Sequence, residues 1–183
     1  MKTIITIILV AVSCVSFVTA QEKFLDKNGV ITFEASEAAF EPVKATNSNV
    51  TMLLDATTGE LAALALMKGF RFKNSLMEEH FNENYIESET YPKATFKGTL
   101  ENFDSTLLNQ KSIQVPVEGV LTLHGKKKKI VTLLNLQKVE DIITVSGSFS
   151  VTPQDFDIEI PKVVQNKIAK EIQISLDFKL VKK

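Results

Sequence analysis

The sequence of 183 residues contains no tryptophan, two histidines and a single cysteine. That cysteine is Cys14, so the chain beyond it can form no internal disulfide and no cysteine-ligated metal site. Metal sites in proteins usually need three or four converging ligands, and His80 and His124 lie far apart along the chain. We therefore expect no metal and no cofactor, and only a narrow range of chemistry.

An excess of charge of either sign is also absent. Lysine and arginine number 21 against 22 aspartate and glutamate, which gives a formal net charge of −1. Such a chain has no overall field to attract nucleic acid, and we expect no nucleic-acid partner. One basic cluster stands out, namely Lys126, Lys127, Lys128 and Lys129. It is typical of a solvated hairpin loop that discourages edge aggregation, and alternatively of a transient contact with anionic lipid headgroups.

The first twenty residues have the pattern of a secretion signal. Lys2 precedes an apolar run at 4–12, and small residues lead up to Ala20. The run is too short to span a membrane comfortably. We expect cleavage before Gln21 and a periplasmic or secreted mature domain at 21–183. In the alternative reading, residues 11–14 are a lipoprotein-type cleavage site, and the protein is anchored through a lipidated Cys14.

Most of the mature chain alternates between apolar and polar residues with a period of two. This pattern predicts strands with one dry and one wet face, and it favours antiparallel pairing. Turn signals at residues 58–59, 124–125 and 140–141 separate several of these strands. An all-β antiparallel barrel of eight strands is favoured, because closure removes long bare edges. The predicted strands are 30–35, 43–47, 50–55, 61–72, 93–101, 115–123, 130–137, 143–151 and 172–180.

Three segments have a mixed or helical character. Ser75 followed by Glu78 is a capping-box pattern, and it predicts a short helix over 76–85. Residues 161–168 have the spacing of a second short amphipathic helix. The alanine and leucine content of 60–67 favours a helix by propensity, but the alternation continues through Phe72, so this segment is predicted to be a strand.

Enzymatic residues are hard to identify. His80 is a candidate general base or metal ligand, but no second histidine stands at ligand spacing. Serines 146, 148 and 150 alternate along one predicted strand without a Gly-x-Ser-x-Gly turn, so they are typical of the solvated face of a sheet. We expect a protein that is not an enzyme. Large aromatic and small residues share the apolar rows, which is compatible with either a packed or a hollow barrel.

Three blocks of the sequence together resemble the YceI-like family of secreted bacterial proteins. The first runs from His80-Phe81 to Tyr91-Pro92-x-Ala94-x-Phe96-x-Gly98. The others are Gly119-x-Leu121-x-x-His124-Gly125 and the segment 154–161. The resemblance covers about residues 29–182. It implies a lipocalin-like barrel with an elongated apolar pocket for a polyisoprenoid or similar lipid, and it is compatible with a homodimer.

On this resemblance the chain is expected to sequester or carry a long apolar lipid, of polyisoprenoid or isoprenoid quinone type, in the barrel. The alternative is a ligand-free barrel that acts as an envelope-stress or protein-interaction module. The helix near 76–85 would lie at the barrel mouth, where His80, Asn82 and Tyr85 are the candidate polar residues for the head end of the ligand. The candidates for the pocket wall are Phe70, Phe72, Met77, Phe81, Phe96, Leu123 and Phe149.

Overall fold

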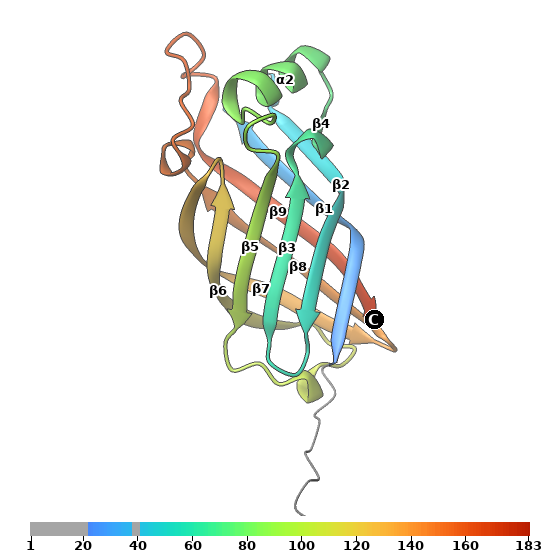
Figure 1. The fold of residues 1–183 in the computed structure, drawn as a ribbon. Coiled ribbons are helices and arrows are strands. Elements are labelled where there is room, and N and C mark those ends of the chain that lie inside the picture. The colour runs from blue at the N-terminus through green and yellow to red at the C-terminus, as the bar shows by residue number, and fades with distance from the viewer. Residues whose placement is uncertain (1–21, 38–40) are drawn as a thin grey trace, which may run out of the picture.

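The computed structural model describes residues 22–37 and 41–183 of the chain. The predicted signal peptide and Cys14 lie outside the described residues. Within them, nine strands form one antiparallel sheet in the order β1-β9-β8-β7-β6-β5-β3-β2-β4, and a further β1–β2 pairing closes it (Figure 1). Because β4 has two residues and pairs only with β2, the other eight strands form the barrel. The predicted eight-stranded antiparallel barrel is confirmed.

The strands are β1 Lys23–Ser36, β2 Lys44–Asp55, β3 Glu60–Leu66, β4 Arg71–Phe72, β5 Lys93–Leu100, β6 Ile113–Leu123, β7 Lys126–Val139, β8 Ile142–Val151 and β9 Ile168–Lys182. Two consecutive helical segments, α2 at Ser75–His80 and the π-helix η2 at Phe81–Tyr85, lie at the upper end in Figure 1. Short 3-10 helices are η1 Met67–Gly69, η3 Ser105–Leu107 and η4 Pro153–Phe156. No helix among the described residues is long and apolar enough to cross a membrane.

The alternating rows point inward as predicted. In β6, for example, Val115 and Val117 are buried, whereas Gln114, Glu118 and Val120 on the other face are exposed. The same division holds in β8, where Ile143 and Val145 are almost completely buried. The period of two therefore correctly identifies which face of each strand lines the barrel interior.

The predicted strand over 61–72 is too long. The β3–β5 ladder ends at the Leu66–Lys93 pair, because the next position on β5 is Pro92, which has no N–H for the ladder. The Met67 N–H donates to the Pro92 carbonyl at 2.9 Å, and the chain then turns through η1. Residues 71–72 continue as β4, which pairs with β2 instead of β5. The strand prediction for 60–66, against its helical propensity, is correct.

The two strands predicted at 43–47 and 50–55 are a single strand, β2. The irregularity lies across the ladder in β1, whose register with β2 shifts on both sides of Gly29. At this position the aromatic ring of Phe178 lies directly against the glycine, and a Cβ atom there would be 1.9 Å from the ring. The bulge and the missing side chain make room for that buried ring.

The hairpin between β6 and β7 consists of His124 and Gly125 alone, with φ angles of 49° and 72°. Two consecutive positive φ values are typical of the tight two-residue turn that joins antiparallel strands. The lysines at 126–129 therefore belong to β7 and pair with β6 from Leu123 back to Val120. The prediction that they form a hairpin loop is wrong, because so short a turn brings them into the ladder at once.

The second helix predicted at 161–168 does not form. These residues make turns, and β9 begins at Ile168. Val163 is 82% exposed, and only part of the apolar row expected for this helix meets the rest of the protein. The first helix does form, but its N-cap is Asn74, whose side chain accepts from the Leu76 N–H at 2.9 Å, rather than Ser75.

Candidate functional site

The upper end of the barrel encloses a cavity of about 510 Å³ beneath α2 and η2. Its wall comes from β1, β3, β4, β5, β6, β8 and β9, and its roof comes from the helical segments and the stretch between η4 and β9. Pockets of this size are typical of small-molecule sites. The side chains contributed by the strands are all apolar, namely Ile31, Phe33, Ala35, Ala65, Phe72, Ala94, Leu121, Leu123, Phe149, Val151, Ile168, Ile172 and Ile174.

Most of the predicted site residues lie on this cavity. Six of the seven wall candidates line it, namely Phe70, Phe72, Met77, Phe81, Leu123 and Phe149. Of the polar candidates, His80 and Tyr85 line it. Phe96 and Asn82 are not part of the lining. The contribution of each residue to ligand binding stays a prediction.

Phe96 and Asn82 have other surroundings. The Phe96 ring lies over Gly98 and Gly119, deeper in the barrel than the cavity. Asn82 turns toward its own helix, where its Nδ2 donates to the Glu78 carbonyl at 2.8 Å. Its Oδ1 is buried without a hydrogen-bond partner among the described residues.

Four phenylalanines connect the helical segment to the barrel wall. Phe81 of η2 stacks on Phe33 of β1, with ring centroids 5.3 Å apart and planes inclined by 27°. It also meets Phe72 at 5.2 Å and Phe70 at 5.9 Å. Aromatic pairs at such distances add about 0.5–1.5 kcal/mol each to the energy of burial. Phe81 therefore anchors the segment over the mouth.

Phe33 was not among the predicted site residues, although a signal for it exists in the sequence. Residues 31, 33 and 35 alternate in the predicted strand 30–35, and all three line the cavity. The alternation identifies them as inward-facing, but it does not show which level of the barrel they reach. Only the pairing of Ile31 with Leu176 and of Phe33 with Ile174 places them in the upper half.

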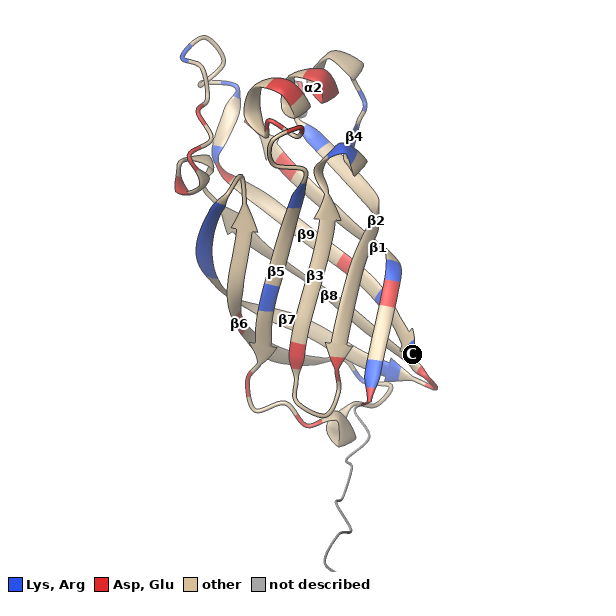
Figure 2. Cartoon of the chain, viewed as in Figure 1, with Lys and Arg blue, Asp and Glu red and all other residues tan. Residues whose placement is uncertain are grey.

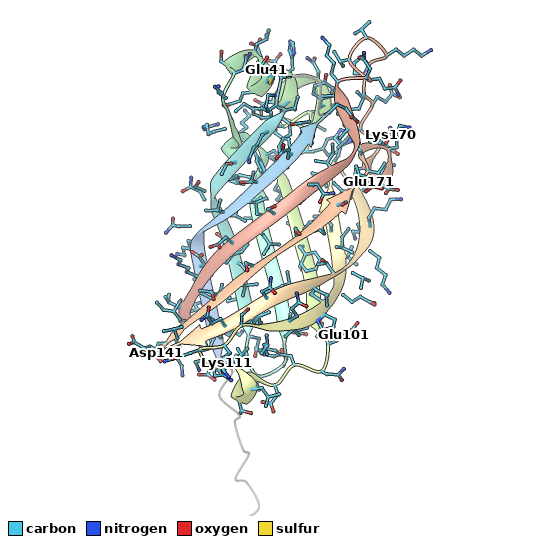
Figure 3. The ribbon with its side chains drawn as sticks, turned by 180° about the vertical axis from the view of Figure 1, so that it is seen from behind. Glu41, Glu101, Lys111, Asp141, Lys170 and Glu171 are labelled. Carbon is cyan, nitrogen blue, oxygen red and sulfur yellow. The ribbon has the colours of Figure 1, made fainter. Side chains whose placement is uncertain are left out.

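Polar groups gather at the mouth. Glu41 and Lys167 line the cavity there, and sequence reasoning identified neither of them. Figure 3 places Glu41 beside the helical end, opposite the end that carries Asp141 and Lys111. His80 is exposed, and Asn74 is occupied as the N-cap of α2. The entrance therefore presents charges of both signs and hydrogen-bonding groups above an apolar interior.

A second set of contacts fixes the rim. His124 of the β6–β7 turn contacts the Phe156 carbonyl oxygen through Nδ1 at 2.9 Å and a Glu87 carboxylate oxygen through Nε2 at 3.1 Å. The Tyr91 ring lies edge-on to the imidazole with a centroid distance of 4.4 Å. Three segments that are distant in sequence thus meet at one histidine, which has a structural role at the edge of the cavity.

The lysines of β7 are largely neutralised by neighbouring acids. Lys126 pairs with Asp157 at 2.6 Å, Lys128 with Asp155 at 2.9 Å and Lys129 with Glu118 at 2.7 Å. The β7–β8 ladder begins only at Leu134, so the upper part of β7 is free to meet η4. Figure 2 shows the basic stretch of β7 with acidic residues nearby. Contact with anionic lipid headgroups stays a prediction.

The ion pair between Lys126 and Asp157 shifts the pKa values of both partners. The hydrogen bond and the charge of Lys126 lower the pKa of the Asp157 carboxyl, and Asp157 in turn raises the pKa of Lys126. Both side chains are more than half exposed, so the solvent screens the attraction and the pair contributes little to stability.

No group of three or more histidine, cysteine, aspartate or glutamate residues that could hold a metal ion occurs in the described parts of the chain. Ser146, Ser148 and Ser150 lie on the outer face of β8, where Ser150 accepts a hydrogen bond from Gln173 at 2.7 Å. The arrangement is that of a container with an apolar interior and a polar entrance.

Comparison with known proteins supports the architecture. No curated protein matches the sequence. Among solved structures, a polyisoprenoid binding domain from Saccharophagus degradans, implicated in plant cell wall breakdown, superposes with a TM-score of 0.76 at 18% identity. The match covers 89% of this chain and 99% of that one.

Two further bacterial structures have the same fold. Burkholderia cenocepacia BcnA gives a TM-score of 0.68 at 15% identity, over 83% of this chain and 96% of that chain. The Campylobacter jejuni YceI protein gives 0.63 at 16% identity, over 79% and 86%. The model of the YceI-like domain family matches residues 15–180. The chain therefore belongs to the YceI-like family, and its barrel is the fold of that family.

Proposed function

We propose that this protein binds an apolar lipid chain, of polyisoprenoid or isoprenoid quinone type, in the upper half of its barrel. One observation carries the proposal: a cavity of about 510 Å³ in which every strand residue of the wall is apolar. The similarity to a polyisoprenoid binding domain agrees with this assignment. The ligand head would lie among the polar residues of the mouth, and the tail would point down the barrel.

The binding mechanism is burial of apolar surface without a chemical step. Each buried methylene contributes about 0.8 kcal/mol, so one five-carbon isoprene unit offers roughly 3–4 kcal/mol before costs. The lost freedom of the ligand offsets a large part of this gain. Aliphatic and aromatic side chains around the cavity suit a branched hydrocarbon, since they offer no hydrogen bond that the chain would leave unmet.

We further propose that the protein sequesters or transports its lipid outside the cytoplasm. The support is the signal-like composition of residues 1–20. The intact mass of the protein purified from the cell envelope distinguishes the two expected N-termini. A chain beginning at Gln21 supports the secreted form, and a lipid-modified chain beginning at Cys14 supports the anchored form.

Native mass spectrometry tests the proposed binding with a matched pair of variants. Leu121→Trp adds bulk inside the cavity, and Val120→Trp makes the same change on the outer face of β6, where residue 120 is 42% exposed. We expect wild type and Val120→Trp to carry an additional lipid mass that solvent extraction removes, and Leu121→Trp to lack it while remaining folded. If no lipid is retained and added polyprenyl lipids or quinones do not bind, the protein is a ligand-free interaction module instead.

A further inference from the structure

The barrel interior is divided into an accessible upper half and a solid lower half. In β9, Ile172, Ile174 and Leu176 are partly accessible, whereas Phe178 and Leu180 are 1% and 0% exposed. The inward-facing residues of β5, β6 and β8 also change from partly accessible to buried, at Leu100, Gly119 and Val145 respectively. Cross-strand pairing places these transitions near one level of the barrel, since Gly98 pairs with Gly119 and Gly147 pairs with Leu176. The cavity therefore has a floor.

The floor is built from large side chains that cover glycines. A Cβ atom at Gly119 or Gly98 would lie 2.4 or 2.8 Å from the tip of the Phe96 ring. The Phe96 ring thus occupies the interior space that side chains at these two positions would otherwise fill. On the opposite wall, the end of the Leu134 side chain covers Gly147 in the same manner. Ala94 and Leu121 line the cavity, and Phe96 is the next inward position below Ala94 and the ladder partner of Leu121, so a tail that passes the cavity lining meets the Phe96 ring next.

The depth of the cavity gives the length of tail that fits above this floor. The cavity-facing part of β9 runs from Ile168 to Ile174. Six strand steps at a tilt of about 40° give a depth of about 15 Å. An isoprene unit extends by four chain bonds, about 5 Å in total. This depth corresponds to about three isoprene units.

We propose that Phe96 limits the length of the bound chain, so that the barrel accepts a prenyl tail of farnesyl size and leaves any further units outside. The proposal rests on the proposed lipid binding and specifies its ligand. Phe96 sets this limit through its position in the floor. A longer polyisoprenoid can still bind by its first units, but the additional units contribute no burial inside the barrel.

Displacement of Nile red by geraniol, farnesol, geranylgeraniol and solanesol tests the length limit. For wild type, we expect affinity to rise from geraniol to farnesol and then to stay level. Phe96→Ala removes the ring from the floor, and we expect geranylgeraniol to bind this variant about tenfold more tightly than farnesol does. Ala94→Phe fills the level above the floor, and we expect it to weaken farnesol about tenfold relative to geraniol. Lys97→Ala, on the outer face of the same strand, should match wild type.

Each outcome separates the length limit from lipid binding itself. A wild-type affinity that keeps rising through geranylgeraniol and solanesol overturns the limit and leaves lipid binding intact. Unchanged length preferences in both Phe96→Ala and Ala94→Phe, with the circular dichroism of folded protein, also overturn it. Failure of all four alcohols to bind wild type, with or without prior delipidation, overturns the proposed function together with the limit.

Discussion

Phe81 anchors the helical segment over the cavity mouth, and its removal should release that segment without unfolding the barrel. Its ring meets Phe33, Phe70 and Phe72 at centroid distances of 5.3, 5.9 and 5.2 Å. Three aromatic pairs at about 0.5–1.5 kcal/mol each give about 1.5–4.5 kcal/mol that Phe81→Ala would remove from the docked state of the segment. Since 1.4 kcal/mol is a factor of ten, the local opening constant should rise about 10- to 1,600-fold.

Native-state hydrogen exchange measures this opening directly. In Phe81→Ala we expect the amides of residues 78–86 to lose protection by that factor, while the inner amides of β6 and β7 keep most of theirs. Glu83→Ala, an exposed position on the same segment, should change protection by less than about 0.5 kcal/mol. Equal loss of protection in the segment and in β6 would refute the local anchor. Full protection of the amides of residues 78–86 in Phe81→Ala would also refute it.

Three further changes test particular contacts. Gly29→Ala places a Cβ atom 1.9 Å from the buried ring of Phe178, so urea unfolding should show that the free energy of unfolding falls by about 1–3 kcal/mol. A second change, Phe178→Leu, should relieve this clash. Equal stability of Gly29→Ala and wild type would contradict the close contact. Asn47 is 1% exposed, and its side chain makes hydrogen bonds of 2.9 Å with the Leu66 carbonyl and the Asn49 N–H. Asn47→Ala should therefore lower the free energy of unfolding by about 2–4 kcal/mol. A loss under half of that would show that water replaces the two hydrogen bonds. Lys126→Met should raise the lowered pKa of Asp157 toward its ordinary value in a carboxyl NMR titration. The folded-state pKa of Asp157 is depressed, so the contribution of this pair is present above the ordinary pKa and is lost as the pH falls through the lowered one. An unchanged titration would show that the pair does not persist in solution.

Much of the fold follows from local pattern. Strict alternation along β5, β6, β8 and β9 specifies strands and the face that each one buries, because successive side chains of a strand point to opposite sides. The wrong predictions concern segments whose structure depends on residues that are distant in sequence. Leu66 ends β3 because Pro92 stands opposite the next residue. Residues 162–167 make turns at the roof of the cavity instead of the expected helix.

The candidate site was predicted in part for the same reason. Phe72, Phe81 and Leu123 stand in apolar rows or on an amphipathic helix, so their inward direction is a local property. Glu41 and Lys167 reach the mouth only because segments at opposite ends of the chain converge there. No sequence pattern brings those two residues together.

The sequence by itself determined the strand faces, the helix at the mouth and the family resemblance, since each depends on residues that are close along the chain. Only the tertiary structure decided where the barrel is hollow and where it is solid. The inward rows of β9 look alike from Ile172 to Leu180, yet the upper ones face a cavity and the lower ones a packed core. The difference arises because rings such as those of Phe96 and Phe178 fill the space left by glycines on other strands. That complementarity exists only after the barrel has closed.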